Sequence, residues 1–408
     1  MNTKKKVPII RIKGFYDDWE QRKLGEMADI VGGGTPSTSN DDYWNGDIDW
    51  YAPAEIADQI YVSSSERKIT QQGYENSPAK MLPVGTVLFT SRAGIGKTAI
   101  LRKEGCTNQG FQSIVPYENM LDSYFIFSRT EELKRYGETK GAGSTFVEVS
   151  GKQMASMELM MPKTVEEQKA IGLYFQNLDH LITFHQREID RIVCLRKAMV
   201  EKLFPQNGAD VPAVRFGRYK EPWRLCQFSE IFTERHIIDT ISDEYPQLAF
   251  TIEEGVIMPE DKKTNKRDFL IIDKATKKYL QTEYDDIIYN PANVIYGAIH
   301  RNALGKGCVS PIYKIFYTDQ DSTFMECIVR HPNFIKEISR SMEGTVKKLR
   351  TLKPKAFLEM SAYIAPTIEE QRQIGEYFRQ MDRLIEIEKE ELEKIKHIKS
   401  ACLEKMFV

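Results

Sequence analysis

The chain contains nearly the same long helix twice. The stretch EEQKAIGLYFQNLDHLITF begins at Glu166, and EEQRQIGEYFRQMDRLIEI begins at Glu369. From Gln168 to Phe204 the chain aligns with Gln371 to Phe407 at a constant offset of 203 residues, without a gap. A repeat of this length predicts a fold built from two equivalent units.

A second, shorter repeat marks the start of each unit. VPIIRIKGFYDDW begins at Val7 and VPAVRFGRYKEPW begins at Val211, and both end on a tryptophan, Trp19 and Trp223. Between these matched ends the two units hardly resemble each other. The predicted boundaries are 1–160 and 207–364 for the two dissimilar domains, and 161–206 and 365–408 for the two helices.

Both helices have clear start signals and an apolar seam. Thr164 with Glu167, and Thr367 with Glu370, are spaced as capping boxes, each preceded by a proline. Apolar residues then follow heptad spacing to the end of each helix, which is typical of a coiled coil. The predicted seam comprises Ile171, Phe175, Leu178, Ile182, His185, Ile189, Ile192, Arg196, Met199 and Leu203, and then Ile374, Phe378, Met381, Ile385, Glu388, Leu392, Ile395, Lys399, Cys402 and Met406.

The length of the helices favours packing of one on the other. At 1.5 Å per residue each helix would reach roughly 60 Å, too long to be buried by one ordinary domain. The alternative is a surface helix on the core of its own domain. Polar residues recur at equivalent seam positions, His185 with Glu388 and Arg196 with Lys399, and such residues often fix register. In an antiparallel pair His185 and Glu388 could meet near the crossing point.

Composition sets broad limits on the class of protein. The formal net charge of the 408 residues is -2, so bulk charge does not indicate a nucleic-acid partner, and a basic surface would have to be local. The basic start is followed by too short an apolar run for a signal peptide, and no stretch is long enough for a membrane span. The six cysteines have no metal-ligand or disulfide-framework spacing. We expect a soluble, reduced, cytoplasmic protein.

Each dissimilar domain combines strand and helix signals, which predicts an α/β fold class. In the first, the stretch from Pro83 reads as strand, polar glycine-rich loop and strand, and 123–136 has a helical pattern. In the second, the stretch from Asp286 again reads as strand, polar loop and strand, and a helix is predicted from Pro332. GGGTPSTSN, from Gly32, is a loop by composition.

Several enzyme-like patterns fail on inspection. SRAGIGKT, from Ser91, ends like a phosphate-binding loop but has serine in place of the first glycine, and no strand ending in a magnesium-binding aspartate is evident. Asn290-Pro-Ala-Asn293 lacks the second proline and the aromatic residue of the aminomethyltransferase motif. The six histidines never take metal-ligand spacing. No catalytic or metal site is therefore predicted.

The polar loops of both domains instead carry donors suited to DNA. Arginine, lysine, asparagine and glutamine match purine edges in the major groove, and lysines and glycine-loop amides serve phosphates. The plain alternative is that these are solvated loop residues. The candidate DNA-binding residues are Thr35, Ser37, Arg92, Lys97, Asn108, Gln109, Ser144, Thr145, Asn293, Tyr296, His300, Arg301, Lys306, Lys347 and Arg350.

The paired EEQ helices, the tryptophan at each unit start and the dissimilar domains together resemble the specificity subunits of type I restriction-modification systems. GDIDW (46–50), TNQGF (107–111) and the SGKQMASMELMMP segment before the first helix also look like that family. The resemblance covers essentially the whole chain. The second domain departs from it, because it lacks TNQGF and the GSTFVEVS loop, so residue roles do not transfer between the two domains.

The resemblance implies a function in DNA recognition. Each domain would be a target recognition domain that reads one half of a split, asymmetric DNA sequence, and the helices would form an antiparallel coiled coil that sets the spacing. The chain would have no catalysis and no cofactor of its own. Two modification (methyltransferase) subunits would dock on it and methylate adenine with S-adenosylmethionine, and restriction subunits would use ATP and Mg²⁺ for translocation and cleavage.

Two other interpretations remain open at this point. One is the specificity subunit of a type II system whose nuclease and methyltransferase are fused. The other is a stand-alone DNA-binding regulator, which would bind its site tightly without a partner.

Overall fold

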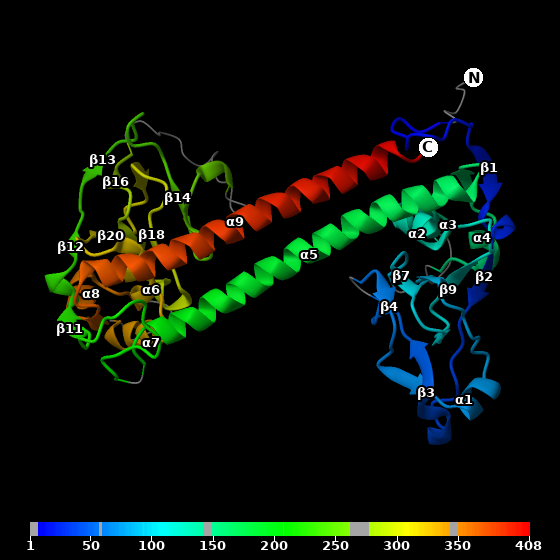
Figure 1. Ribbon diagram of the computed structural model, residues 1–408, viewed down its shortest axis with the longest axis horizontal. Helices are drawn as coiled ribbons and strands as arrows, with labels where there is room; N and C mark the ends of the chain where they lie inside the picture. Colours follow the sequence, from blue (N-terminus) through cyan, green and yellow to red (C-terminus); the bar gives the residue numbers. More distant parts are fainter. Residues whose placement is uncertain are drawn as a thin grey trace. The chain divides into compact units, whose positions relative to one another are not determined.

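The computed structural model describes residues 7–56, 59–92, 94–141, 148–206, 208–261, 277–342 and 350–408. The chain forms two compact units, each with its own helices and sheets (Figure 1). Unit 1 comprises residues 1–186 and 390–408, and unit 2 comprises residues 187–389. Each unit therefore includes one part of each long helix. The long helices are α5, Val165–Leu203, and α9, Ile368–Lys405.

Unit 1 combines a five-stranded sheet of order β2-β9-β6-β7-β4 with a three-stranded sheet of order β5-β3-β8 and the antiparallel pair β1-β10. The strands are β1 Glu20–Lys23, β2 Ala28–Gly32, β3 Trp44–Tyr51, β4 Tyr61–Val62, β5 Arg67–Ile69, β6 Val87–Phe89, β7 Thr98–Leu101, β8 Cys106–Thr107, β9 Gln112–Pro116 and β10 Glu158–Met161. The shorter helices are α1 Gln71–Glu75, α2 Ser123–Ser128, α3 Thr130–Gly141 and α4 Gly151–Ala155.

Unit 2 uses the same kinds of element in another arrangement. It has a four-stranded sheet of order β12-β20-β17-β18, a three-stranded sheet of order β13-β16-β19, and the pairs β14-β15 and β11-β21. The strands are β11 Arg224–Gln227, β12 Thr233–Glu234, β13 Ile238–Asp239, β14 Ala249–Thr251, β15 Gly255–Ile257, β16 Tyr279–Thr282, β17 Ile287–Tyr289, β18 Ile299–Arg301, β19 Gly307–Val309, β20 Lys314–Tyr317 and β21 Ser361–Ile364. The shorter helices are α6 Ser322–Val329, α7 Pro332–Ser341 and α8 Pro354–Leu358.

The predicted α/β class and the two long helices are confirmed. The strand, loop and strand predicted from Pro83 are β6 and β7, which pair antiparallel, and the helix predicted from Pro332 is α7. The helical pattern of 123–136 is divided into α2 and α3. The stretch from Asp286 holds more than the predicted two strands, because β17, β18, β19 and the start of β20 all fall within it.

Both long helices begin with half of the predicted capping box. The Thr164 hydroxyl accepts the Glu167 N–H, and Thr367 accepts the Glu370 N–H. The carboxylates do not fold back onto the helix start, so the capping-box prediction is wrong in its second half. Each carboxylate instead accepts hydrogen bonds from an arginine and a tryptophan of the segment that starts its unit.

We call this arrangement the clasp. In unit 1, Arg11 donates two hydrogen bonds of 2.8 Å to the Glu167 carboxylate, and the Trp19 indole N–H donates a third at 3.2 Å. In unit 2, Arg215 and Trp223 bind Glu370 in the same way, with distances of 2.8, 2.6 and 3.4 Å. Both carboxylates are buried. The shorter repeat noticed in the sequence is thus the part of each unit that holds the start of its helix.

The residue after each clasp glutamate attaches the domain to the helix. The Gln168 side chain accepts the backbone N–H of Asp122, the N-cap of α2, and Gln371 does the same for Asp321, the N-cap of α6. Next on the same face comes the repeated glycine, Gly172 or Gly375. A Cβ there would lie 2.5 or 2.1 Å from the N-cap carboxylate, so only glycine lets the domain approach this closely.

Within each unit the two long helices run antiparallel (Figure 1). In unit 1 the end of α9 lies beside the start of α5, and Phe407 stacks on Phe175 with ring centroids 5.7 Å apart. In unit 2 the end of α5 lies beside the start of α9, and Phe204 stacks on Phe378 at 6.3 Å. All twenty seam residues are buried or half-buried.

The seam cations Arg196 and Lys399 do not pack together in one layer of the coiled coil, because each pairs with a different aspartate. Arg196 pairs with Asp382 in unit 2, with Nε 2.6 Å from Oδ1. Lys399 pairs with Asp179 in unit 1, with Nζ 2.5 Å from Oδ1. The two ion pairs are equivalent under the repeat. His185 and Glu388 belong to different units, and their pairing stays a prediction.

Candidate nucleic-acid interface

The loop after β2 in unit 1 has a fixed backbone. The Gly34 N–H donates to the Thr107 carbonyl at 2.8 Å, and the Trp50 indole donates to the Gly34 carbonyl at 2.8 Å. A Cβ on Gly34 would lie 2.3 Å from the Pro78 carbonyl carbon, so a larger residue would push the loop away. The following residue, Thr35, is therefore presented from a rigid position.

A second loop, 107–110, packs on the first and completes a cluster. Its turn is closed by the Asn108 side chain, which accepts the Gly110 N–H at 2.7 Å. The Thr35 hydroxyl bonds to the side-chain oxygen of exposed Gln109. The structure thus brings Thr35 and Gln109 together from separate loops, whereas one side-chain atom of Asn108 serves the turn.

Arg92 lies at the edge of this cluster. The Ser91 N–H donates to the Gly110 carbonyl at 2.8 Å, which brings the half-exposed Arg92 beside the second loop. Lys97 is exposed at the other end of the same loop. Among the residues that the structure describes, neither cation has an acid within ion-pair distance. We call Thr35, Gln109 and Arg92 the unit 1 loop cluster.

One cation near this cluster was not singled out from the sequence. Arg67 lies over the Trp44 ring, with its guanidinium carbon 3.7 Å from the ring centroid, and the Trp44 indole donates to the carbonyl of exposed Ser37. No local sequence signal reports this, because the arginine and the tryptophan come from different strands. Ser144 and Thr145 lie outside the described residues.

Two neighbouring lysines are held by a buried acid. Lys68 and Lys103 both reach Asp49, at 3.4 and 2.8 Å, and the Asp49 side chain is fully buried. Although burial opposes ionisation, the bonds from Lys103 and Ser65 keep the pKa of Asp49 below its ordinary value. These lysines therefore anchor β3, and the Asp49 carboxylate compensates one of their two charges.

Two of the predicted cations of unit 2, Arg301 and Lys306, are ion-paired. Arg301 contacts Asp285 at 2.9 Å and Glu326 at 3.6 Å, and its side chain is 11% exposed. Lys306 contacts Glu244 at 2.5 Å. Each of these two cations therefore has an acidic partner within ion-pair distance, whereas Arg92 has none among the described residues.

The prediction that His300 contacts DNA is wrong. The residue is 3% exposed, and its Nε2 donates to the Ile252 carbonyl at 2.8 Å. Burial, together with the nearby Arg330 charge, lowers the pKa of His300 to about 4, so the ring is neutral at pH 7. The residue is part of the unit 2 interior.

The other predicted positions in unit 2 do not gather around these cations. Tyr296 is 69% exposed at the end of the short 3-10 helix that begins after Asn293. Arg350 donates to the Met342 carbonyl at 3.1 Å. Lys347 lies outside the described residues.

The enzyme-like patterns have structural roles. The SRAGIGKT stretch runs into strand β7, whereas a phosphate-binding loop opens a helix. The Asn290 side chain accepts the backbone N–H groups of Ala292 and Asn293 and so closes a turn. Among the described residues there is no group of three histidine, cysteine or acidic side chains placed to hold a metal ion.

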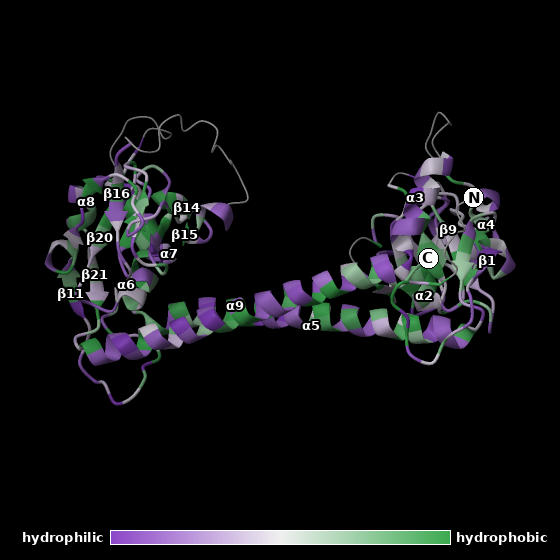
Figure 2. Ribbon diagram, turned by 90° about the horizontal axis from the view of Figure 1, so that it is seen from above, coloured by the Kyte–Doolittle hydropathy of each residue, from purple (hydrophilic) through white to green (hydrophobic). Residues whose placement is uncertain are grey.

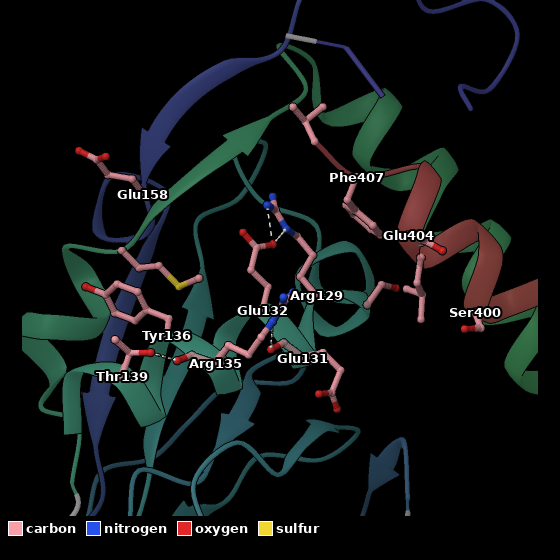
Figure 3. A pocket seen from close by; sticks show the side chains of 14 residues that line it. Arg129, Glu131, Glu132, Arg135, Tyr136, Thr139, Glu158, Ser400, Glu404 and Phe407 are labelled. Carbon is pink, nitrogen blue, oxygen red and sulfur yellow. Dashed lines mark hydrogen bonds and ion pairs between the residues drawn. The ribbon is translucent and has the colours of Figure 1, made fainter. Parts of the chain in front are cut away.

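A cavity of about 850 Å³ lies in unit 1 between α3 and the end of α9 (Figure 3). On one wall Arg129 is fully buried and paired with Glu132 at 2.7 Å, and its guanidinium lies 5.4 Å from the Phe407 ring centroid. Ser400 and Glu404 form part of the opposite wall. This arrangement attaches the helix end to the domain, and it lies away from the loop cluster.

Residues 16–193 match a family described as Type I restriction modification DNA specificity domain. Among curated proteins, the chain is 36% identical over 166 residues to the MjaIX type I specificity subunit of Methanocaldococcus jannaschii, and 29% identical over 174 residues to the EcoR124I/EcoR124II specificity subunit of Escherichia coli. Each alignment covers 40% of this chain, and they cover 38% and 42% of those two relatives.

Two further similarities extend over nearly the whole chain. The MjaVIII specificity subunit of M. jannaschii is 21% identical over 408 residues, covering 95% of this chain and 91% of that protein. The crystal structure of a type I S subunit from M. genitalium has a TM-score of 0.61 at 15% identity, covering 98% of this chain and 99% of that one. The structural likeness supports the fold. The family resemblance predicted from the sequence is confirmed. Within the described residues no helix is long and apolar enough to span a membrane.

Proposed function

Residues 16–193 match the type I DNA specificity domain, and from this similarity we propose that the chain is a type I restriction-modification specificity subunit that recognises a DNA target made of two unlike halves. The observation that carries the proposal is the contrast within the repeat. The clasps of Glu167 and Glu370 are the same, whereas the loops that the two units present differ in residues and charge. Two units with the same helix attachment but different exposed loops favour a DNA site with two different halves.

In unit 1 the loop cluster would read base edges. Arg92 has the paired donors that guanine accepts, and Gln109 has the donor and acceptor that adenine matches. The fixed backbone around Gly34 supports this role, because a reader must hold its side chains in place. Unit 2 would read its half-site with other groups, since Arg301 and Lys306 are already neutralised.

Modification subunits would dock on the long helices. In unit 1 the exposed apolar residues Leu181, Phe184 and Ile398 occupy positions beside the seam. The repeat places Leu384, Ile387 and Leu195 at the same positions in unit 2, all between 45% and 50% exposed. Exposed apolar patches of this kind are typical of interaction sites. Two equivalent patches fit two copies of one partner.

The chemistry would come from those partners. Adenine methylation would be carried out by the modification subunits with S-adenosylmethionine, and translocation and cleavage by restriction subunits with ATP and Mg²⁺. The chain itself would supply recognition and docking without catalysis. The length of the helices between the units would set the gap between half-sites.

The test is a domain exchange. Residues 24–160 are replaced by the corresponding domain of a relative, and methylated adenines are mapped by sequencing in cells that carry the matching modification subunit. We expect one half of the methylated sequence to change and the other half to persist. If both halves changed, or neither did, the modular assignment would be wrong. A chain that binds its site equally tightly with and without the modification subunit would instead be a stand-alone regulator.

A further inference from the structure

Four adjacent strands of unit 1 correspond to four of unit 2, although the sheets as wholes differ. The order β2-β9-β6-β7 matches β12-β20-β17-β18, and every neighbouring pair in both sets is antiparallel. β6 continues into β7 through the loop 90–97, and β17 continues into β18 through 290–298. The loops of the two units can therefore be compared one by one without any sequence similarity.

The unit 1 loop cluster lies at one end of these strands. Thr90, directly after β6, forms a β-bridge with Phe111, directly before β9. The loop that holds Arg92 and the loop that holds Gln109 thus leave the sheet at the same end. At this end unit 1 presents hydrogen-bonding side chains.

The corresponding end of the unit 2 strands presents apolar side chains. The loop after β17 and the loop before β20 leave the sheet together, because Tyr289 pairs with Lys314. Ile312 is 59% exposed and Tyr296 is 69% exposed. The exposed residues of these two loops are Ala292, Tyr296, Pro311 and Ile312.

Ile312 is held on a closed turn. The Tyr313 N–H donates to the Ser310 carbonyl at 3.1 Å, and Pro311 fixes its own φ at the second position of the turn. The Tyr313 ring packs 5.0 Å from that of Phe250, on a hydrophobic cluster to which β14, β15 and β20 contribute (Figure 2). The exposed isoleucine therefore projects from a fixed backbone, as a base-reading side chain requires.

Tyr296 is also held in place. It ends the short 3-10 helix that begins at Val294, and its N–H donates to the Asn293 carbonyl at 2.9 Å. Val294 is fully buried and anchors this helix in the core. Both apolar side chains are thus presented by ordered loops.

The paired cations of unit 2 lie at the other end of the sheet. Arg301 pairs in register with Ile287, the first residue of β17, and Lys306 follows in the next loop. At the apolar end Lys314 is half-buried, and no acid lies within ion-pair distance of it in the part of the chain that the structure describes. A lysine in this place suits a phosphate contact.

In the major groove, the apolar group that distinguishes one base pair from the others is the 5-methyl group of thymine. We infer that unit 2 recognises thymine methyl groups with Ile312, assisted by Tyr296, where unit 1 uses hydrogen bonds. The inference rests on the proposed function, because it assumes that unit 2 binds its half-site with the sheet end that corresponds to the unit 1 loop cluster. An apolar contact of this kind also removes no water from a charged group.

The experiment uses the full chain with the modification subunit of the same source genome. The half-site of unit 2 is the half that persists when residues 24–160 are exchanged. Duplexes of the mapped target are prepared with each thymine in turn replaced by deoxyuridine, which lacks only the methyl group. In the half-site of unit 2 we expect at least one replacement to weaken binding about fourfold, the effect of one buried methyl group.

Ile312→Ala then assigns the contact. It should weaken binding of the thymine duplex about fourfold and leave binding of the deoxyuridine duplex within twofold, so that the preference for thymine at that position is lost. Tyr296→Ala should reduce the preference in the same half-site. The matched control is Leu225→Ala, which removes a side chain that is 63% exposed on β11, in a different sheet. It should keep the full preference.

The inference is overturned if no deoxyuridine weakens binding in the half-site of unit 2, or if Ile312→Ala keeps the preference for thymine. It is also overturned if Ile312→Ala weakens association with the modification subunit and not the preference, since the loop would then contact protein. In each case the domain exchange still supports the proposed function, which falls only if the exchange itself fails. The deoxyuridine series on the wild type needs no variant and is unaffected by a folding defect.

Discussion

The loops of unit 1 and unit 2 use their charges in opposite ways. In unit 1, Arg92 lies beside the rigid Thr35–Gln109 contact, and among the described residues no carboxylate lies within ion-pair distance of it, although exposed Glu148 is its partner in an antiparallel β-bridge. In unit 2, Arg301 is held by Asp285 and Glu326, and Arg235 by Glu283 and Asp286. The presence of a cation in a loop therefore does not by itself indicate a DNA contact. Its role depends on whether the fold supplies a carboxylate for it.

The helix ends show the reverse situation. There the two units share the clasp, the glutamine contact with the N-cap backbone and the ion pair between the helices. Buried, paired groups hold the helix ends, which the two units share. The surfaces that differ between the units are formed by loops. The predictions below test this division, beginning with the part that the units have in common.

The largest effect is expected at the clasp. Removing one partner of a buried ion pair typically costs about 3–5 kcal/mol, because the other charge is left without compensation. Glu370→Gln should destabilise unit 2 by about 3 kcal/mol, near the lower end, since Gln keeps a polar group for Trp223. Glu167→Gln should have a slightly smaller effect on unit 1, because Arg11 is more exposed than Arg215.

Calorimetry of the full chain, with each unit's transition followed separately, gives the measurement. The controls are the adjacent glutamates, Glu166→Gln and Glu369→Gln, which are exposed and should change stability by less than about 0.5 kcal/mol. A clasp variant as stable as its control would mean that the shared contacts do not hold the units.

The second effect concerns pH and separates the units. His300 has a folded pKa of about 4 against an ordinary value of 6.5, so the unfolded chain binds more protons between these values. The stability contributed by neutral His300 is therefore present above pH 6.5 and is lost as the pH falls toward 4. At pH 5 the loss should be roughly 2 kcal/mol, and it should appear in unit 2.

The pH dependence is tested with His300→Gln, which cannot titrate. Burial also lowers the pKa of His331 in unit 2, which acts in the same direction, so the variant should lose most of the slope and not all of it. Asp122 and Asp286 have raised pKa values from burial, one in each unit, and do not distinguish the units. His180→Gln, on the exposed face of α5, is the control. An unchanged slope in His300→Gln would refute the assignment.

The third prediction contrasts the two loop arginines. Arg92→Ala should weaken DNA binding about tenfold and relax selectivity in one half-site, because an arginine that reads a base contributes about 1–3 kcal/mol. Arg301→Ala should instead lower the thermal stability of unit 2, since it leaves Asp285 without its arginine and removes one of the two arginines that contact Glu326. The measurements are affinity on a panel of single-base variants of the target, and melting temperature.

Arg22→Ala is the control for a simple loss of positive charge. Arg22 lies on β1 beside Glu20 and Glu26, away from the loop cluster. If this change weakened binding as much as Arg92→Ala, the cluster would act through general charge and not through base reading. If Arg301→Ala relaxed selectivity without loss of stability, the contrast between the units would be reversed.

The sequence predicted the two long helices and the two-unit repeat, because these features depend on periodic spacing and on internal repetition. The heptad spacing selected twenty positions that are all buried or half-buried, because helix geometry places every such residue on one face. It did not predict the clasp. Glu167 is three residues from Thr164 and fits a capping box, whereas its actual partner, Arg11, is 156 residues away. Local spacing cannot report which distant group competes for a carboxylate.

The candidate DNA residues show the same limit. Thr35 and Gln109 come from two loops that composition marked as polar, but their contact depends on the fold of the six strands between them, β3 to β8. His300 and Arg301 were selected from an equally polar loop, and neighbouring elements bury one and pair the other. Side-chain type suggests a chemical ability. Burial and partners decide whether it is available.

The smallest effect is expected at the ion pairs between the helices. Asp179 and Lys399 have side chains 9% and 29% exposed, and Asp179 also accepts the Tyr124 hydroxyl at 2.8 Å. Asp382 and Arg196 are 46% and 25% exposed. Because exposed ion pairs contribute little, the coupling energy should be about 1 kcal/mol in unit 1 and below about 0.5 kcal/mol in unit 2. Double-mutant cycles with Asp179→Asn and Lys399→Met, and with Asp382→Asn and Arg196→Met, measure both couplings.

Repeating these cycles at 1 M salt should reduce the unit 2 coupling by the larger fraction, since water and ions reach Asp382 more freely. A unit 2 coupling as large as that of unit 1 would show that bidentate arginine geometry outweighs exposure at equivalent positions of this repeat.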